Sequence, residues 1–266
     1  MAGKGYRTIV VKKTTKVTPH MQRIIFTGDD LVDFPDEQEG GYVKLLFSRN
    51  GQAISKKSQL RIGQYLGRIY TIRSFNRDNN ELVIEFSLYR RNAGLASKWA
   101  ELTKPGDKIL IDNPKLIKLV DDKSDWFLLA GDMSGLPAIC CNLERLPSHA
   151  QGYVMIEVVS ESDKQALKVP EGMAVSWIIN DNPGKNSDAL LTGIKSLPWK
   201  DGNPYVWMAG EFDSINKIRS YIESYNLDKE NTYIASFWKP SYAEGNDGIG
   251  KQIDFVYKAI AKMLKF

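Results

Sequence analysis

The stretch Arg68-Ile69-Tyr70-Thr71-Ile72-Arg73 combines β-branched and aromatic residues and carries an arginine at each end. Such a composition favours a β-strand, in which Tyr70 shares a face with Arg68 and Thr71 shares the opposite face with Arg73. Taken alone, the pattern allows two interpretations equally well. The stretch could be an ordinary strand with two exposed arginines, or a strand that offers a ring and two guanidinium groups to an anionic ligand. The surrounding sequence decides between these interpretations.

Strand patterns surround this stretch in the first part of the chain. Residues 81–88 alternate, with Leu82, Ile84, Phe86 and Leu88 on one face. The other expected strands are Tyr6 to Val17, Met21 to Thr27, Tyr42 to Phe47 and Lys108 to Asp112, and one helix is expected from Ala93 to Leu102. Many short strands with a single helix predict an antiparallel β-barrel domain over residues 1–120.

The pattern changes after the charged segment Asp121 to Asp125. Short apolar runs then alternate with helical segments. The expected strands are Trp126 to Ala130, Gly152 to Val159, Val175 to Ile179, Tyr205 to Ala209 and Thr232 to Phe237; the expected helices are Leu136 to Leu146, Ser187 to Ser196 and Ser214 to Tyr225. Apolar strands separated by helices predict a Rossmann-like parallel sheet, covered on both faces, over residues 121–240.

A tail of residues 241–266 follows the second domain. Its apolar residues Ile253, Val256, Ile260 and Leu264 fall at helical spacing, with lysines outside this stripe. We expect an amphipathic C-terminal helix that docks on its own protein; a lysine-rich helix of this kind could also bind a membrane surface.

Composition limits the possible functions. The chain has 266 residues, of which 42% are hydrophobic and 26% charged, as in ordinary globular proteins. No apolar run is long enough for a membrane span, and the first residues lack a signal sequence, so we expect a cytoplasmic protein. The net charge of +4 comes from interspersed residues, which argues against nucleic-acid binding. Nothing demands a dimer, and a monomer is expected.

Few residues could carry chemistry on their own. The two cysteines, Cys140 and Cys141, are adjacent in an apolar helical stretch, and the two histidines have no ligand spacing to them. We therefore predict no metal site and no catalytic side chain, and we expect a bound cofactor to supply the chemistry.

A barrel followed by a parallel α/β domain can hold a flavin in the first domain and a nicotinamide at the strand ends of the second. Tyr70 could then lie against the isoalloxazine, Thr71 could meet its polar edge, and Arg68 and Arg73 could pair with the pyrophosphate. Small residues at the start of the helix near Gly94 would let a phosphate group approach the backbone N–H groups of the helix N-terminus. The loop that follows the first α/β strand is not a G-x-G-x-x-G motif, so the usual dinucleotide fingerprint is absent.

The chain resembles the siderophore-interacting proteins, which are FAD-dependent ferric-siderophore reductases of the ferredoxin–NADP reductase-like superfamily. The similarity extends over nearly the whole chain. It rests on Gly41-Tyr42-Val43-Lys44-Leu45, the Arg-x-Tyr-Thr-x-Arg motif at 68–73, Gly94-Leu95-Ala96-Ser97 with Trp99-Ala100, Pro105-Gly106-Asp107, Gly131-Asp132 with Leu136-Pro137-Ala138, Ala209-Gly210-Glu211 and Phe237-Trp238-Lys239. Each motif is short, but all occur in the order of the family.

The resemblance implies a set of cofactor contacts. These are Arg68, Tyr70, Thr71 and Arg73, with Ala96 and Ser97 at the phosphates, Asp132 and Ser134 near the cofactor or the nicotinamide, and Trp238 near the flavin. The chain also departs from the family pattern. It has Met133-Ser134 where Glu-Thr is usual, Leu95 where Pro is usual, no His after Leu88, and Phe237-Trp238-Lys239 in place of Tyr-Trp-Arg.

The same resemblance implies a ferric siderophore as substrate, bound by a basic cluster beside the flavin. The candidates are Lys44, Lys115 and Lys239, and each could instead be a solvated surface lysine. Cations suit a substrate that is often anionic. The iron belongs to the substrate, and Fe(II) is held weakly by hard oxygen chelators, so that its reduction releases it.

The electron donor is open between NADH, NADPH and reduced ferredoxin. The segment Ser160 to Lys164 has one lysine among acids, which does not favour a 2′-phosphate and leads us to expect NADH. Two rival functions differ in their acceptor or in their chemistry. One is a ferredoxin or flavodoxin reductase, and the other is a non-catalytic siderophore-binding protein.

Overall fold

The computed structural model describes residues 5–60, 64–89, 94–186 and 188–240. The chain divides into two compact units, Met1–Ile117 and Lys118–Phe266. The expected C-terminal helix within residues 241–266 lies outside the described residues. In the part of the chain that is described, no helix has the length and apolar character needed to cross a membrane.

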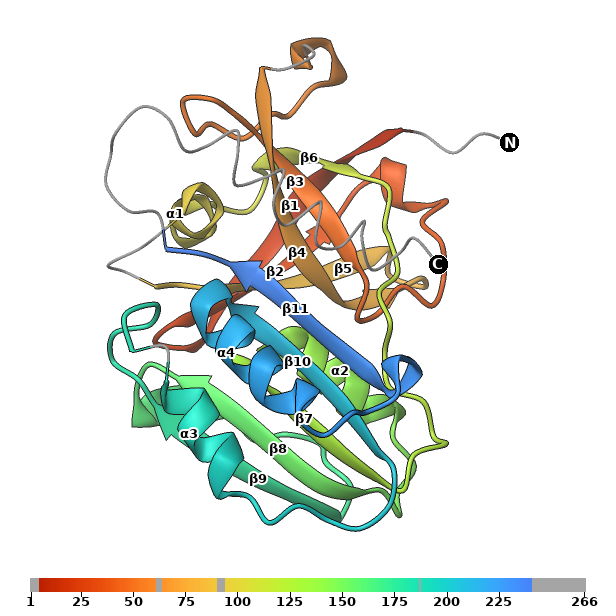
Figure 1. Ribbon diagram of the computed structural model, residues 1–266. Coiled ribbons are helices and arrows are strands. Elements are labelled where there is room, and N and C mark those ends of the chain that lie inside the picture. Colours follow the sequence, from red (N-terminus) through yellow and green to blue (C-terminus); the bar gives the residue numbers. More distant parts are fainter. Residues whose placement is uncertain (1–4, 61–63, 90–93, 187, 241–266) are drawn as a thin grey trace. The chain divides into compact units, whose positions relative to one another are not determined.

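The first unit is a closed barrel of six antiparallel strands in the order β1-β2-β5-β4-β3-β6 (Figure 1). The strands are β1 (Tyr6–Thr18), β2 (Met21–Thr27), β3 (Tyr42–Ser48), β4 (Tyr65–Asn76), β5 (Glu81–Ser87) and β6 (Lys108–Asp112), and the helix α1 covers Leu95–Leu102. Closure leaves every strand paired on both sides, which removes the exposed edges of an open sheet. The predicted antiparallel barrel is confirmed.

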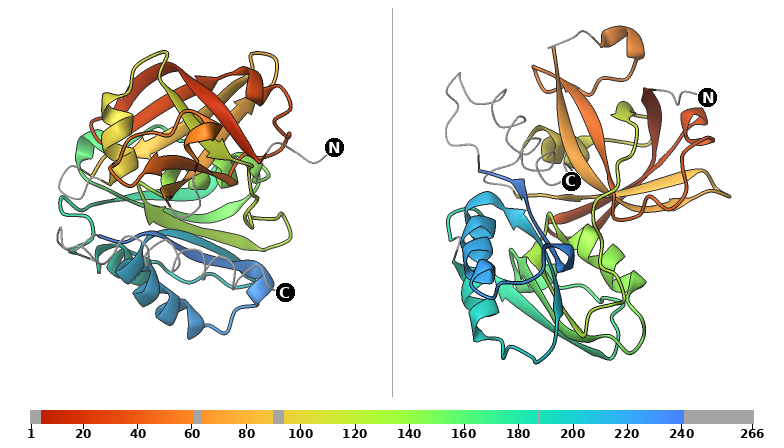
Figure 2. Two further views of the ribbon diagram at one scale, coloured as in Figure 1. Left: turned by 90° about the horizontal axis from the view of Figure 1, so that it is seen from above. Right: turned by 45° about the vertical axis from the view of Figure 1, so that its right-hand side comes forward.

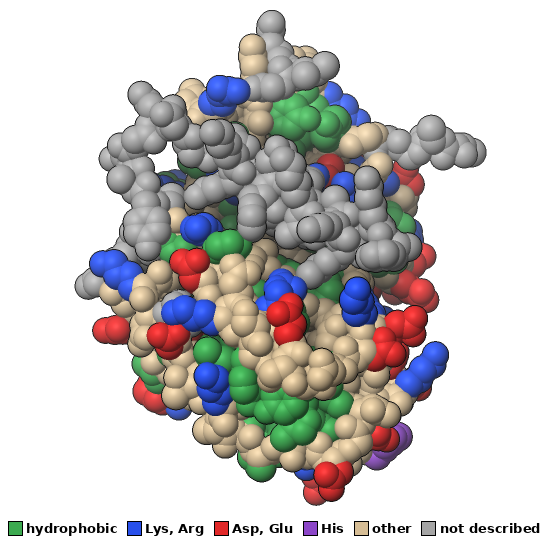
Figure 3. Space-filling model, viewed as in Figure 1, with side chains coloured by type: hydrophobic (Ala, Val, Ile, Leu, Met, Phe, Trp, Pro, Cys, Tyr) green, Lys and Arg blue, Asp and Glu red, His purple; other side chains and the backbone are tan. Residues whose placement is uncertain are grey.

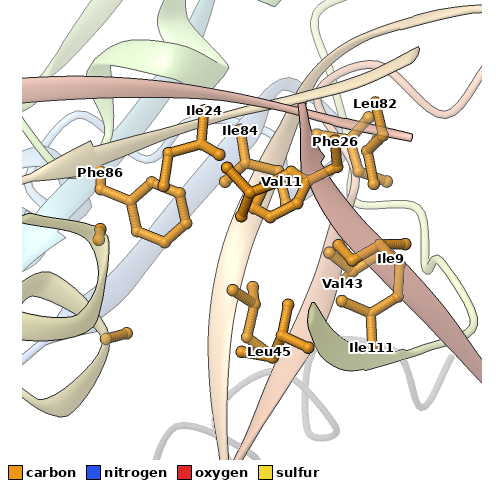
Figure 4. Packing of buried hydrophobic residues seen from close by; sticks show 14 of the residues in the cluster. Ile9, Val11, Ile24, Phe26, Val43, Leu45, Leu82, Ile84, Phe86 and Ile111 are labelled. Atoms are coloured by element: carbon orange, nitrogen blue, oxygen red, sulfur yellow. The ribbon is translucent and has the colours of Figure 1, made fainter. Parts of the chain in front are cut away.

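Alternate residues of the strands fill the barrel. Leu82, Ile84, Phe86 and Leu88 are all buried, as their alternation predicts. Figure 4 shows residues of β1, β2, β3, β5 and β6 packed together in this core. Trp99 of α1 adds a ring whose centroid lies 6.1 Å from that of Phe86. The helix thereby packs against the barrel core, and its first turn is held in place beside β5.

The second unit is a five-stranded parallel sheet in the order β11-β10-β7-β8-β9. The strands are β7 (Trp126–Asp132), β8 (Gln151–Val158), β9 (Gly172–Ile179), β10 (Pro204–Glu211) and β11 (Thr232–Trp238), and the helices are α2 (Leu136–Arg145), α3 (Ala189–Ser196) and α4 (Phe212–Glu223). Helix α2 covers one face, and α3 and α4 cover the other (Figure 2). Every residue of β7 and β10 is buried, which explains their continuous apolar sequences.

The strand order reverses between β7 and β10, which are neighbours although two strands separate them in the chain. In open parallel sheets, ligands bind beyond the carboxyl ends of the strands at such a reversal. The predicted Rossmann-like sheet is confirmed, and its order singles out the ends of β7 and β10.

The segment after Ile117 is attached to the second unit. The hydroxyl of Tyr205 donates to the carbonyl of Leu119 at 3.0 Å, and the indole of Trp207 donates to the carbonyl of Lys118 at 3.0 Å. Both rings are buried in β10. Their polar atoms therefore satisfy the backbone of the connecting segment.

Charges of both signs are interspersed on the face seen in Figure 3. Lysine and arginine side chains alternate there with aspartate and glutamate. This distribution agrees with the scatter of charges along the sequence.

Candidate functional site

The Arg68–Arg73 stretch lies in β4, as expected. Tyr70 packs on Phe86 of β5 with ring centroids 4.3 Å apart. The side chain of Ser97, from α1, lies within hydrogen-bonding reach of the Tyr70 phenol. The positive charge of the Arg68 guanidinium also interacts electrostatically with this phenol. Burial raises the pKa of Tyr70 to about 12, although Ser97 and Arg68 oppose this shift. The fold thus brings together Arg68, Tyr70 and Ser97 from two separate motifs.

Arg68 has the surroundings of an anion-binding residue. Its guanidinium donates to the carbonyl of Gly67 at 3.0 Å, and no carboxylate pairs with it among the described residues. Burial lowers the pKa of Arg68, which shows that its charge is partly withdrawn from water. A partly buried arginine without an acidic partner is suited to a phosphate ligand.

The first turn of α1 lies beside this arginine and tyrosine. The helix begins after Gly94, which provides no side-chain cap, and a Cβ at Gly94 would meet no atom within 4 Å. Ser97 donates to the carbonyl of Ser87 at 2.9 Å, which fixes the turn to β5. Ala96 is buried in the barrel core, so that only its backbone could reach a phosphate. These residues fit FAD, because they present a guanidinium with no acidic partner among the described residues, an aromatic ring and a helix start.

The other two residues of the motif are placed by pairing with β3. Thr71 is buried opposite Tyr42, and the N–H of Ile72 donates to the carbonyl of Gly41 at 2.8 Å. A register shift between Ile72 and Ser74 forms an irregularity at Arg73. Because bulges redirect side chains, simple alternation does not determine where Arg73 points.

Two of the three candidate substrate lysines lie together in the first unit. Lys44 Nζ is 3.7 Å from Asp112 Oδ2, and its backbone N–H donates to Asp112 Oδ1 at 2.7 Å. The segment of Lys115 is bound to β3, since the backbones of Tyr42 and Lys115 exchange hydrogen bonds of 2.8 and 2.9 Å. Asp112, at the end of β6, was not predicted from the sequence, and the charges of both lysines act on its carboxylate.

The electrostatics of this pair follow from its partial burial. Desolvation, together with the nearby charge of Lys115, lowers the pKa of Lys44 to about 8, against the opposing effect of Asp112. Burial also raises the pKa of Asp112, against the effect of both lysines. Two cations beside one carboxylate leave a net positive charge that an anionic ligand could neutralise.

One polar or aromatic residue lies at or next to the carboxyl end of each strand of the second sheet. We call this set the carboxyl-edge row, and in spatial order it consists of Trp238, Glu211, Asp132, Glu157 and Asn180. Asp132 pairs with Glu157 across β7 and β8, and it accepts the backbone N–H of Glu211 at 2.9 Å. Asn180 donates to Glu157 Oε1 at 3.0 Å.

Asp132 is the centre of this row. Its Oδ1 accepts the N–H and the hydroxyl of Ser134 at 2.8 and 2.5 Å, and its Oδ2 accepts the Trp238 indole at 2.6 Å. A Cβ at Gly210 would lie 3.0 Å from Asp132 Oδ2, which explains the glycine of Ala209-Gly210-Glu211. The predicted residues Asp132, Ser134 and Trp238 are thus joined to one another directly.

Three buried carboxyl groups stand side by side in the row. Burial raises the pKa of Asp132 and of Glu211, and burial with the charges of Asp132 and Glu211 raises the pKa of Glu157 to about 8. Glu211 Oε1 is buried without a hydrogen-bond partner among the described residues. No group of His, Cys, Asp or Glu in the described chain is arranged to hold a metal ion.

Lys239 follows the row in the second unit. Its ammonium lies 4.4 Å from the centroid of the Phe212 ring, at the start of α4. This cation–π contact orients the side chain of Lys239.

The sequence interpretation missed Glu157 and Asp112 as site residues. Each lies at or next to the end of a strand, and this position is the signal in the sequence that could have identified them.

A closed antiparallel barrel followed by a parallel α/β sheet, with the residues just described, defines a flavoprotein of the ferredoxin–NADP reductase type. Within that class, the chain belongs to the siderophore-interacting protein family. Residues 10–117 match the siderophore-interacting FAD-binding domain, and residues 124–241 match the siderophore-interacting protein domain.

Individual relatives agree with this membership. Ferric vibriobactin reductase ViuB of Vibrio cholerae is 30% identical over 234 residues, which cover 84% of this chain and 85% of the relative. The NADPH-dependent ferric-chelate reductase of Escherichia coli K12 is 24% identical, covering 88% and 92%. The crystal structure of the siderophore-interacting protein SipS from Aeromonas hydrophila superposes with a TM-score of 0.75 at 29% identity, covering 89% and 99%.

Proposed function

We propose that this protein is an FAD-dependent ferric-siderophore reductase that reduces siderophore-bound Fe(III) to Fe(II) and releases iron in the cytoplasm. The observation that carries this proposal is the convergence of Arg68 and Ser97 on the phenol of Tyr70. On the neighbouring strand β3, Lys44 pairs with Ile69, the residue between Arg68 and Tyr70. Membership of a family whose first domain is described as FAD-binding supports it.

The residues of the first unit would hold the cofactor. Arg68 and Arg73 pair with the pyrophosphate, and Tyr70 and Thr71 meet the isoalloxazine. The first turn of α1 provides Ser97 and the backbone of Ala96 for the phosphates. From the second unit, Asp132, Ser134 and Trp238 are proposed contacts to the cofactor or to a nicotinamide.

Flavin chemistry, with its two-electron and one-electron exchange, would connect a hydride donor to the one-electron reduction of ferric iron. The protein's own task is to bind and orient. Lys44, Lys115 and Lys239 attract the anionic chelate and hold it by charge. No acid–base residue is needed at the iron, because the chelator releases Fe(II) through its weaker affinity.

We propose NADH as the electron donor. In the loop after β8, the buried Asp163 accepts hydrogen bonds from the N–H and the hydroxyl of Ser160. The ammonium of Lys164 is paired with the carboxylate of Glu161 at 2.6 Å. Lys164 is therefore paired with an acid, and the segment Ser160 to Lys164 offers no unpaired cation to a 2′-phosphate; Lys168, nearer β9, is the other lysine of this loop. NADPH, which the name of the Escherichia coli relative specifies, and reduced ferredoxin are the alternatives to be compared.

The experiment is an anaerobic stopped-flow series on the purified holoprotein. Flavin reduction is followed with NADH, NADPH and reduced ferredoxin, and the reduced protein is then mixed with several ferric siderophores. The proposal expects rapid reoxidation by ferric chelates that slows in Lys44→Gln and Lys239→Gln. A colourless protein would instead indicate a binding protein, and reoxidation only by ferredoxin or flavodoxin would indicate another acceptor.

A further inference from the structure

The register of the strands determines which side chains are neighbours on the outer face of the barrel. Tyr6 of β1 pairs with Asp112 of β6, and Leu45 of β3 pairs with Ile111 of β6, so that Asp112 and Lys44 are neighbours on the outside. On the far side of β3, Lys44 pairs with Ile69 of β4. One row across four strands therefore carries Tyr6, Asp112, Lys44 and Ile69.

A second, apolar row lies beside the first. Leu46 and Leu110 face outward from β3 and β6, and Ile54 lies between them through backbone hydrogen bonds of 2.9 and 2.7 Å to Leu46 and Leu110. These three side chains are buried, and Tyr6, Leu60 and Tyr65 pack against them.

Tyr6 and Tyr65 approach each other across this apolar row. Tyr65 begins β4 and pairs with Ser48, so the two tyrosines start from opposite corners of the four-strand face. Their hydroxyl oxygens are nevertheless 3.0 Å apart. Both side chains must therefore extend across the face, where Gly67 contributes no side chain.

The two tyrosines are partly exposed, and Tyr6 lies directly opposite Asp112 in the barrel sheet. The charge of Asp112, which contacts Lys44, acts on the phenol of Tyr6. The hydrogen bond to Tyr65, with burial, raises the pKa of Tyr6 to about 12, so that this phenol is uncharged at neutral pH. Two aromatic rings therefore lie on the same outer face of the barrel as the site of Lys44 and Asp112.

We propose that Tyr6 and Tyr65 form an aromatic floor that extends the Lys44–Lys115 site and selects ferric chelates whose iron is held by catecholate or phenolate rings. This inference rests on the proposed function. An aromatic chelate places its anionic oxygens on the iron and its ring edges outward. The lysines can meet its charge while the tyrosines stack on its rings, whereas an aliphatic chelate of equal charge would use the lysines alone.

The test measures the dissociation constants of redox-inert Ga(III) chelates with the FAD-loaded protein. The probes are an anionic Ga(III) tris-catecholate and Ga(III) citrate, which is anionic but not aromatic. Tyr6→Leu and Tyr65→Leu should each weaken catecholate binding by about two- to tenfold and leave citrate binding unchanged. Tyr6→Phe and Tyr65→Phe keep the rings and should retain catecholate affinity.

Control variants distinguish the loss of ring contact from the loss of charge or of folding. Lys44→Gln should weaken both chelates, because it removes charge and not ring contact. Melting temperatures of the leucine variants establish that they are folded, and the phenylalanine variants repeat the test without a change in ring packing. Unchanged catecholate affinity in the leucine variants, or equal weakening of both chelates, overturns the inference. The proposed function fails separately, if the reduced wild-type protein reduces no ferric chelate.

Discussion

The indole nitrogen of Trp238 donates a 2.6 Å hydrogen bond to Oδ2 of Asp132, joining the ends of two strands that are not neighbours in the sheet. The same oxygen accepts the N–H of Glu211, from the strand between them. One carboxylate therefore aligns the ends of β7, β10 and β11. The positions of Trp238 and Glu211 at this edge of the sheet therefore depend on their hydrogen bonds to Asp132.

Replacing Asp132 by Asn should destabilise the second unit. The amide would present N–H donors toward the donors of Ser134 or toward those of Glu211 and Trp238. We expect a loss of about 2–3 kcal/mol in the free energy of unfolding, measured by urea denaturation. Ser134→Ala removes fewer of these bonds and should cost only about 1 kcal/mol. Equal stabilities of the two variants would contradict a central role for the carboxylate.

Glu157 should make stability depend on pH. Its folded-state pKa is raised to about 8 from an ordinary value of 4.5, so the folded protein binds a proton that the unfolded chain has lost. The stabilisation is complete below about pH 4.5 and is lost as the pH rises to about 8, at no more than about 1.4 kcal/mol per pH unit. Denaturation curves at several pH values measure this slope.

The matched variant is Glu157→Gln, whose carbonyl can still accept the hydrogen bond from Asn180. We expect a flatter pH profile and greater stability at pH 8 than in the wild type. Parallel profiles for the two proteins would rule out titration of Glu157 as the cause.

Affinity for an anionic chelate should fall as the pH rises through about 8, because the lowered pKa of Lys44 causes it to lose its charge there. The expected loss is about fivefold, the factor that about 1 kcal/mol represents. Lys44→Arg keeps its charge and should bind Ga(III) citrate equally well at pH 7 and pH 9. Lys217→Gln, which changes a lysine paired with Asp188, is the control and should behave as the wild type. A pH-dependent Lys44→Arg variant would locate the titration elsewhere.

Arg68→Gln should weaken FAD binding by about tenfold or more, since it removes a charged donor from the proposed pyrophosphate contact. Flavin absorbance per protein after gel filtration measures the retained cofactor. The control is Arg77→Gln, an exposed arginine of the same unit that pairs with Asp36 and should retain FAD. Full flavin content in Arg68→Gln would remove this residue from the proposed site.

Local patterns were sufficient for the architecture. The alternation of Leu82, Ile84, Phe86 and Leu88 predicted a strand with one buried face, and the apolar run from Trp126 predicted a strand buried on both. Periodicity reports how each segment is buried, and the order of such segments limits the possible folds. The motif at residues 68–73 could likewise be placed on a strand before its surroundings were known.

The sequence by itself therefore determined the two domain types, the strand that carries Arg68 and Tyr70, and the resemblance to a family. Only the tertiary structure decided which groups meet: Trp238 and Glu211 with Asp132, Asp112 with Lys44, and Tyr6 with Tyr65. These contacts join strands that are distant in the chain. Their register depends on closure of the barrel and on packing of the parallel sheet, which no local pattern encodes.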